Sequence, residues 1–300
     1  MNITFRQLRL FLALAETGSV SGAAKAMHVT QPTASMQLRE VSQAVGLPLY
    51  EVISRRVHLT EAGHMLARTA RTIAGEWDAF EQRVAGTKGL TSGRLKVAVV
   101  STAKSFVPRL LGSFCKLHPQ IDISLEVLNR DHVIQRLRAN QDDLYVMSMP
   151  PADLPLEDQI LMPNPLVVIA PADHPLAARK RIRLEQLQAE RFILREKGSG
   201  TRMATDAHLR QAGFAPGAVL ELGSNEAIKE SVEGQLGISI VSLHALGPRH
   251  EGLAVLNVAG FPIRSQWHLV WPKGKQLSPI AEVFREHLMQ EARGWMGGAH

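Results

Sequence analysis

Between residues 95 and 292 the chain alternates short apolar segments, rich in branched residues, with amphipathic segments. Strands are predicted at residues 95–100, 121–128, 143–149, 166–170, 218–222, 237–242 and 267–272. Helices are predicted at residues 106–118, 131–140, 201–212, 225–235 and 278–292. This alternation is typical of parallel sheets joined by crossover helices. The stretch is long for a single sheet, so we expect two α/β lobes.

The first sixty residues follow a different pattern, with three short helical segments before a predicted β-hairpin. Gly18 ends the first helix, and Ser19 can cap the second, which is rich in alanine. Thr30 can cap the third helix, which has Pro32 in its first turn and ends at Gly46. A small-residue helix, a tight turn and a capped helix are the ingredients of a helix-turn-helix.

The third helix is the element expected to read DNA, because in this motif its N-terminal end enters the major groove. Glutamine can pair with adenine through two hydrogen bonds, and hydroxyl side chains reach bases or phosphates. Basic residues at the hairpin tip can meet phosphates or the minor groove. The candidates are Thr30, Gln31, Thr33, Ser35, Arg39, Arg55 and Arg56. The alternative is an ordinary helical hairpin with a polar surface.

A long helix is predicted from about residue 61 to 87, and its apolar residues repeat at intervals of four and three. The members of this seam are Leu66, Ala70, Ile73, Trp77, Phe80 and Val84. A heptad seam favours pairing with a second long helix, and hence a dimer. Burial against the chain's own body produces the same pattern. Residues 86–93 are predicted to be a linker.

Ligands of open α/β sheets bind beyond the carboxyl ends of strands, often at helix N-termini. Hydroxyl groups, glycines and basic residues follow several predicted strands here. The candidate effector-binding residues are Ser101, Thr102, Ala103, Asn129, Ser148, Met149, Gly198, Ser199, Gly200, Thr201, Arg202 and Asn225. Each hydroxyl taken singly fits a helix cap, whereas the whole set favours a small anion such as a phosphate or carboxylate.

Composition excludes some classes of protein. A formal net charge of +6 is compatible with a polyanionic partner, although many globular proteins share it. Arg6 and Arg9 interrupt the first apolar stretch, and no apolar run is long enough to span a bilayer. We therefore expect no signal peptide, no membrane partner and a cytoplasmic location. Cys115 is the only cysteine, which excludes an intrachain disulfide, and it is expected to be a core residue of a helix.

The N-terminal segments AAKAMHVTQPTAS, VGLPLY and LTEAG resemble, in this order, the signature of the LysR-type transcriptional regulators. The resemblance extends over essentially the whole chain. It implies a winged helix-turn-helix, a coiled-coil linker helix and a two-lobed effector domain like a periplasmic binding protein. Gln31, Pro32 and Ser35 would then touch DNA, as would a hairpin arginine. The position after Ser35 departs from the family, because Met36 stands where arginine or glutamine is common. Met36 either contacts a thymine methyl group or packs against a neighbour.

The domain limits that follow are residues 1–60 for the winged helix-turn-helix, 61–92 for the linker and dimerisation helix, and 93–300 for the effector domain. Within the effector domain, lobe I is expected to comprise residues 93–163 and 268–293, and lobe II residues 164–267. The expected partners are double-stranded promoter DNA, RNA polymerase, and a second copy of the chain in a homodimer that assembles to a homotetramer. No cofactor or metal is expected.

Within the family, the effector domain resembles the Calvin-cycle (RuBisCO-operon) regulators most. The segments that carry this resemblance include HPQIDISLEVLNRDHVIQRL, LREKGSGTR and ELGSNEAIKESV. It implies control of carbon-fixation genes through an anionic effector such as a phosphorylated sugar, a carboxylate or a nucleotide such as NADPH. A LysR-type regulator of another metabolic pathway is the alternative.

Two other classes of protein compete with a regulator. An enzyme is disfavoured because the twelve histidines are scattered without a HExxH spacing, and because no GxSxG nucleophile elbow occurs. A small-molecule-binding protein without DNA activity leaves the first sixty residues without a role.

Overall fold

The structure is a computed structural model that describes residues 2–54, 56–87, 93–247 and 251–297. The chain divides into two compact units, consisting mainly of residues 1–88 and of residues 89–300. Each unit has its own hydrophobic core and is described separately.

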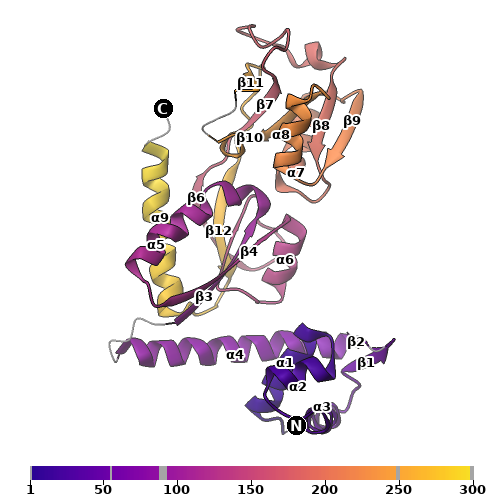
Figure 1. Ribbon diagram of the computed structural model, residues 1–300, viewed down its shortest axis with the longest axis vertical. Coiled ribbons are helices and arrows are strands. Elements are labelled where there is room, and N and C mark those ends of the chain that lie inside the picture. The colour runs from indigo at the N-terminus through magenta and orange to yellow at the C-terminus, as the bar shows by residue number, and fades with distance from the viewer. Residues whose placement is uncertain (1, 55, 88–92, 248–250, 298–300) are drawn as a thin grey trace. The chain divides into compact units, whose positions relative to one another are not determined.

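The N-terminal unit contains α1 (Phe5–Thr17), α2 (Val20–Ala26), α3 (Gln31–Val45), the strands β1 (Tyr50–Ile53) and β2 (Arg56–Leu59), and α4 (Glu61–Thr87) (Figure 1). The predicted helix boundaries are confirmed: Gly18 and Gly46 end α1 and α3 in the left-handed conformation, and the Ser19 side chain caps α2. β1 and β2 form an antiparallel hairpin. Ala23 and Ala24 are buried, so the small side chains let α2 pack closely against its neighbours.

Gly63 permits the close approach of α4 to the segment before the hairpin. A Cβ atom at this position would overlap the carbonyl oxygen of Leu49. The same junction is fixed by Thr60, whose hydroxyl donates to the carbonyl of Pro48 at 2.7 Å and accepts from the N–H of Gly63 at 3.1 Å. The threonine and the glycine of the LTEAG segment therefore allow the linker helix to pack closely on the N-terminal core.

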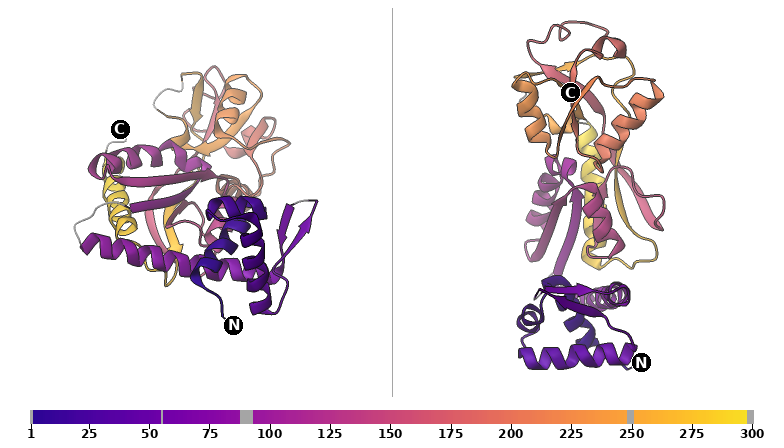
Figure 2. Two further views of the ribbon diagram at one scale, coloured as in Figure 1. Left: turned by 60° about the horizontal axis from the view of Figure 1, so that its bottom comes forward. Right: turned by 90° about the vertical axis from the view of Figure 1, so that its right-hand side faces the viewer.

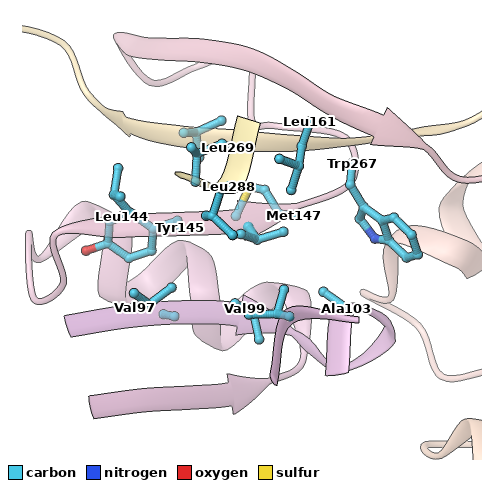
Figure 3. Close-up of a cluster of buried hydrophobic side chains, with 14 of the residues drawn as sticks. Val97, Val99, Ala103, Leu144, Tyr145, Met147, Leu161, Trp267, Leu269 and Leu288 are labelled. Atoms are coloured by element: carbon cyan, nitrogen blue, oxygen red, sulfur yellow. The ribbon is translucent and has the colours of Figure 1, made fainter. Parts of the chain in front are cut away.

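The C-terminal unit consists of two lobes, each built on a five-stranded sheet (Figure 1). The first lobe has the strand order β4-β3-β5-β12-β6 and carries α5 (Val107–Leu117), α6 (Arg130–Arg138) and α9 (Pro279–Gly297). Its strands are β3 (Gly93–Val100), β4 (Ile121–Leu128), β5 (Leu144–Met147), β6 (Leu156–Pro163) and β12 (Gln266–Pro272). Its hydrophobic core contains side chains of the sheet and of the helices that cover it, and it includes Trp267, Val99 and Leu269 (Figure 3).

The second lobe has the strand order β11-β7-β10-β8-β9, and α7 (Gly200–Gln211) and α8 (Asn225–Glu233) are its longer helices. Its strands are β7 (Leu166–Pro171), β8 (Arg191–Arg195), β9 (Ala218–Leu222), β10 (Ile238–Ser242) and β11 (Leu253–Leu256). Alternate strand residues enter two separate core clusters, one with Leu209 of α7 and one with Ile228 of α8. The two helices therefore cover opposite faces of the sheet, as Figure 2 (right) shows.

The expectation of parallel sheets is corrected by the strand directions. β3 pairs in parallel with β4 and β5, but β12 is antiparallel to β5 and β6, and β7 is antiparallel to β10 and β11. The chain enters the second lobe after β6 and returns through β12, so both sheets are mixed. The strands β6, β8 and β11 were not predicted.

A second correction concerns Cys115, which is exposed rather than in the core. The buried face of α5 is formed instead by Val107, Leu110, Leu111 and Phe114. Cys115 directly follows Phe114 on this helix, and a one-residue step of about 100° turns its side chain away from the sheet.

Candidate functional site

The start of α3 has the geometry of a capped helix. The hydroxyl oxygen of Thr30 accepts from the N–H of Thr33 at 3.4 Å, and the two threonine hydroxyls are 2.8 Å apart. Ala34, Leu38 and Val41 face the core. The other residues of α3 are half-buried or exposed.

The exposed face of α3 carries most of the predicted DNA-contacting residues. Gln31, Pro32, Met36 and Arg39 are exposed, and they recur at helical spacing on the side away from the core. Thr33 and Ser35 are half-buried. Met36 is 55% exposed and is outside the hydrophobic core, which favours a surface contact over packing against a neighbour.

The hairpin supplies a second candidate contact. Arg56 is exposed at the start of β2, next to a tight reversal in which Ser54 has a φ of 50°. Arg55 lies outside the described residues. The hairpin residues Val52 and Ile53 are also exposed.

The apolar seam of α4 divides into two halves. Ala70 is fully buried and Leu66 is half-buried, both against the core of their own unit, so the pairing prediction is corrected for this half. Ile73, Trp77, Phe80 and Val84 are exposed. The rings of Trp77 and Phe80 lie 5.7 Å apart, which makes a continuous aromatic surface on the distal half.

In the C-terminal unit, the predicted ligand-binding segments meet where the two lobes face each other. Arg195, at the end of β8, donates from Nη2 to the hydroxyl of Ser101 at 2.9 Å and from Nη1 to the side-chain oxygen of Asn225 at 2.9 Å. Ser101 begins the short 3₁₀ helix Ser101–Ser105 of the first lobe, and Asn225 begins α8 of the second. The structure thus brings together two predicted residues through an arginine that was not among the candidates.

A second link joins the same two elements. The Nζ of Lys104 lies 2.7 Å from Oε2 of Glu226, which also accepts from the hydroxyl of Ser224. Burial alone would raise the pKa of Glu226, but the hydrogen bonds from Lys104 and Ser224 outweigh it and lower that pKa to about 2. Glu226 is therefore ionised at neutral pH.

The loop before α7 lies against the first lobe. A Cβ atom at Gly198 would overlap the carboxylate of Asp131, and one at Gly200 would overlap the hydroxyl of Ser148. A larger residue at either position would require the side chain of Asp131 or of Ser148 to move. Gly198 also has a φ of +87°.

Several buried hydroxyls border this contact. Ser199 precedes α7 but makes no capping hydrogen bond, and the Oγ1 atom of Thr201 is buried without a hydrogen-bond partner among the described residues. Thr102 and Ala103 are buried in the 3₁₀ helix that follows β3. The buried hydroxyl of Thr201, which has no partner among the described residues, is available to a ligand.

Other candidates have roles within the fold. Asn129 caps α6, because its side-chain oxygen accepts from the N–H of His132 at 3.0 Å. Arg130 donates to the carbonyl of Met149 at 2.6 Å, and burial lowers the pKa of its guanidinium.

Arg202 is engaged by the side chain of Asp206, at 2.9 Å, and by that of Glu221, at 3.1 Å. Since both carboxylates belong to its own lobe, Arg202 is a weaker candidate than Arg195. The structure therefore favours capping for Asn129 and an internal ion pair for Arg202.

A cavity of about 650 Å³ lies beside the segments that connect the lobes. It shares only Met149 with the candidate effector residues. It is lined by Met149, Pro163, Pro165, Ala204, Ala207, His208, Gln211, Ile263, Arg264, Ser265, Gln266 and His268.

Within the described ranges, no cluster of histidine, cysteine, aspartate and glutamate side chains is arranged to hold a metal ion. Among the helices that the structure describes, none combines the length and apolar character needed to cross a membrane.

Two family models match the chain. Residues 5–64 match the bacterial regulatory helix-turn-helix protein, lysR family, and residues 88–293 match the LysR substrate binding domain. The two matches correspond to the helix-turn-helix region and to the two-lobed unit described above.

Curated relatives cover nearly the full chain. The HTH-type transcriptional activator CmpR of Synechocystis is 43% identical over 96% of this chain and 95% of its own length. The RuBisCO operon transcriptional regulator of Acidithiobacillus ferrooxidans is 42% identical over 95% of this chain and 93% of its own. These relatives are transcriptional regulators rather than enzymes.

Solved structures agree with this assignment. The regulatory domain of Synechocystis CcmR in complex with 2-PG is 44% identical, covers 67% of this chain and 98% of its own, and has a TM-score of 0.65. Full-length CbnR complexed with its target DNA is 25% identical over 97% of this chain and 100% of its own, with a TM-score of 0.66. Since the helix-turn-helix, the two mixed sheets and the near full-length matches agree, this chain belongs to the LysR family of transcriptional regulators.

Proposed function

We propose that this regulator controls carbon-fixation genes in response to a small phosphorylated metabolite that binds between the lobes of its C-terminal unit. The observation that carries the proposal is the solved regulatory domain, 44% identical to this chain, that was determined in complex with 2-PG, or 2-phosphoglycolate. Full-length relatives at 42–43% identity are named for activation of transcription or for the RuBisCO operon. The buried Arg195 and the hydroxyls around it are suited to an anion.

The proposed DNA contacts are made by the exposed face of α3 and by the hairpin. Gln31 would read a base, while Thr30, Thr33, Ser35 and Arg39 would contact bases or phosphates. Arg56 and Arg55 would contact phosphates or the minor groove. The exposed Met36 has an apolar end suited to a thymine methyl group.

The exposed half of the α4 seam supports a dimer as the DNA-binding species. Two copies would bring two recognition helices to the two halves of an operator. Assembly of dimers into a tetramer and a contact with RNA polymerase complete the proposed mechanism, in which effector binding closes the cleft and changes the bend of the DNA. The proposed domain limits are residues 1–60, 61–92 and 93–300.

Footprinting of the promoter region of a RuBisCO operon, with and without 2-phosphoglycolate, tests the proposal. We expect protection in both cases and a change in its extent when the metabolite is added. Identical footprints and bend angles would contradict regulation by this metabolite. Protection only of promoters of unrelated genes would favour a LysR-type regulator of another pathway.

A further inference from the structure

Arg195 is a buried cation at the contact between the lobes. The residue is 2% exposed, and its guanidinium is held by Ser101 of the first lobe and Asn225 of the second. A buried positive charge is costly unless an anion compensates it. The identity of that anion therefore determines the stability of this contact.

In the structure the compensating anion is the adjacent residue, Glu196. Its carboxylate accepts from Nε of Arg195 at 2.7 Å and from Nη2 at 2.9 Å, which is the paired geometry that guanidinium groups form with carboxylates and phosphates. The side chain of Glu196 is 20% exposed, whereas that of Arg195 is 1% exposed. The Glu196 side chain therefore reaches solvent, whereas the Arg195 side chain does not.

We propose that Glu196 is an internal counter-ion, which a phosphate group of the effector replaces on the Nε and Nη2 edge of Arg195. The inference rests on the proposed function, because it assigns the anionic effector to this part of the cleft. Ser101 accepts a hydrogen bond from Arg195, which leaves its own O–H proton to donate to a phosphate oxygen.

The exchange gives Glu196 a role in selecting the ligand. A monoanionic carboxylate that replaces Glu196 exchanges one negative charge for another and gains little Coulomb energy at Arg195. A dianionic phosphate brings an additional charge and an additional acceptor oxygen to the same guanidinium. Displacing Glu196 costs the same for either ligand, so Glu196 sets a threshold for binding at Arg195 that a phosphate monoester exceeds and a simple carboxylate does not.

The substitution Glu196→Gln tests this role, because it keeps the size of the side chain and removes its charge. Calorimetric titration of the full-length protein, at constant ionic strength, would measure the binding of inorganic phosphate and of glycolate. In the variant we expect both anions to bind at least about tenfold more tightly than in the wild type, so that glycolate also binds measurably. Glu282→Gln is the matched control, since Glu282 forms a surface ion pair with Arg285 at 2.8 Å on α9.

If Glu196 only stabilises the fold, the variant would be less stable and would bind phosphate no more tightly than the wild type, and this result would overturn the inference. A second measurement avoids dependence on the variant's folding. In a crystal structure of the wild-type protein with 2-phosphoglycolate, we expect phosphate oxygens at Nε and Nη2 of Arg195 and the Glu196 carboxylate displaced. Glu196 still paired with Arg195 beside the bound ligand would also overturn it.

These results separate the inference from the proposed function. If the wild type ignores 2-phosphoglycolate while Glu196→Gln binds inorganic phosphate tightly, the metabolite is wrong and the counter-ion role stands. If 2-phosphoglycolate binds and alters the footprint while Glu196 stays on Arg195, the proposed function stands and the counter-ion role fails.

Discussion

Lys104 of the first lobe and Glu226 of the second form an ion pair of 2.7 Å, beside the Arg195 contact. Because the pKa of Glu226 is lowered to about 2, its ionised form favours the folded protein. The stabilisation is present above the ordinary pKa of 4.5 and is lost as the pH falls through about 2. Both side chains are substantially exposed, so we expect the ion pair to contribute less than about 1 kcal/mol to the free energy of unfolding.

Lys104→Met should raise the Glu226 pKa towards 4.5, measured by NMR titration of its carboxyl carbon. Lys116→Met, on the exposed side of α5, should leave that pKa unchanged.

Gln31→Ala should weaken binding to the specific operator by about 1–3 kcal/mol, because a base-reading pair is lost. Gel-shift titrations against specific and non-specific DNA at one salt concentration measure the effect. Gln43→Ala removes the same side chain from an exposed position near the other end of α3 and should bind normally. An unchanged affinity and site preference in Gln31→Ala would rule out base reading by Gln31.

Gly63→Ala should destabilise the N-terminal unit by about 1–3 kcal/mol, because the added methyl group overlaps the Leu49 carbonyl. Gly75→Ala is the control and should not lower the stability of the unit. A Cβ atom at Gly75 meets no neighbour within 4 Å, and alanine favours the helix by up to about 1 kcal/mol. Urea unfolding followed by circular dichroism compares the two variants. Equal stability would show that α4 can shift away from Leu49 at little cost.

Phe80→Glu should dissociate the proposed dimer, because a carboxylate would be placed in an apolar helix–helix seam. Sedimentation velocity at several protein concentrations measures the association state. Met65→Glu adds the same charge at another exposed apolar position of α4 that is outside the seam, and it should remain associated. A Phe80→Glu protein that sediments like the wild type would argue that α4 does not form the main dimer contact.

Thr102→Val and Ser199→Ala should reduce the response to 2-phosphoglycolate while leaving DNA binding without the metabolite intact. Both residues are buried near the contact between the lobes, so loss of a hydroxyl removes a hydrogen bond to the ligand at small cost in shape. Fluorescence anisotropy of labelled promoter DNA, titrated with the metabolite, measures the response. Ser113→Ala, on α5, is the control for loss of a hydroxyl outside the cleft. Normal responses from both cleft variants would mean that the effector binds elsewhere.

Local chemistry explains why much of the N-terminal unit could be predicted. The capping residue Thr30 and the helix-ending residues Gly18 and Gly46 act on backbone groups a few positions away, so their effect is written in a short stretch of sequence. The apolar seam of α4 was also predicted from the sequence, but its division into a buried half and an exposed half was not. Whether Ala70 or Phe80 meets the chain's own core depends on where α4 leaves the domain, which periodicity does not specify.

The directions of strands and the central residue of the cleft could not be predicted in the same way. β8 has only three apolar residues between Arg191 and Arg195, and it lacks the longer run that marks a buried strand. Arg195 is buried because Ser101 and Asn225, 94 and 30 positions away, hold its guanidinium. In the sequence, Arg195 is visible only as a charged residue at the end of a short apolar segment. Its burial and its role depend on contacts with residues that are distant in the sequence.

The position of β12 has a consequence for synthesis of the chain on the ribosome. β5 and β6 belong to one sheet only through β12, which pairs with both, and β12 is made only after the whole second lobe. The second lobe is continuous in sequence and can fold as it emerges, whereas the first must wait without the strand that joins β5 to β6. A chain whose synthesis ends before Gln266 would thus have a complete second lobe and an open first sheet, which is the form that chaperones or proteases would meet.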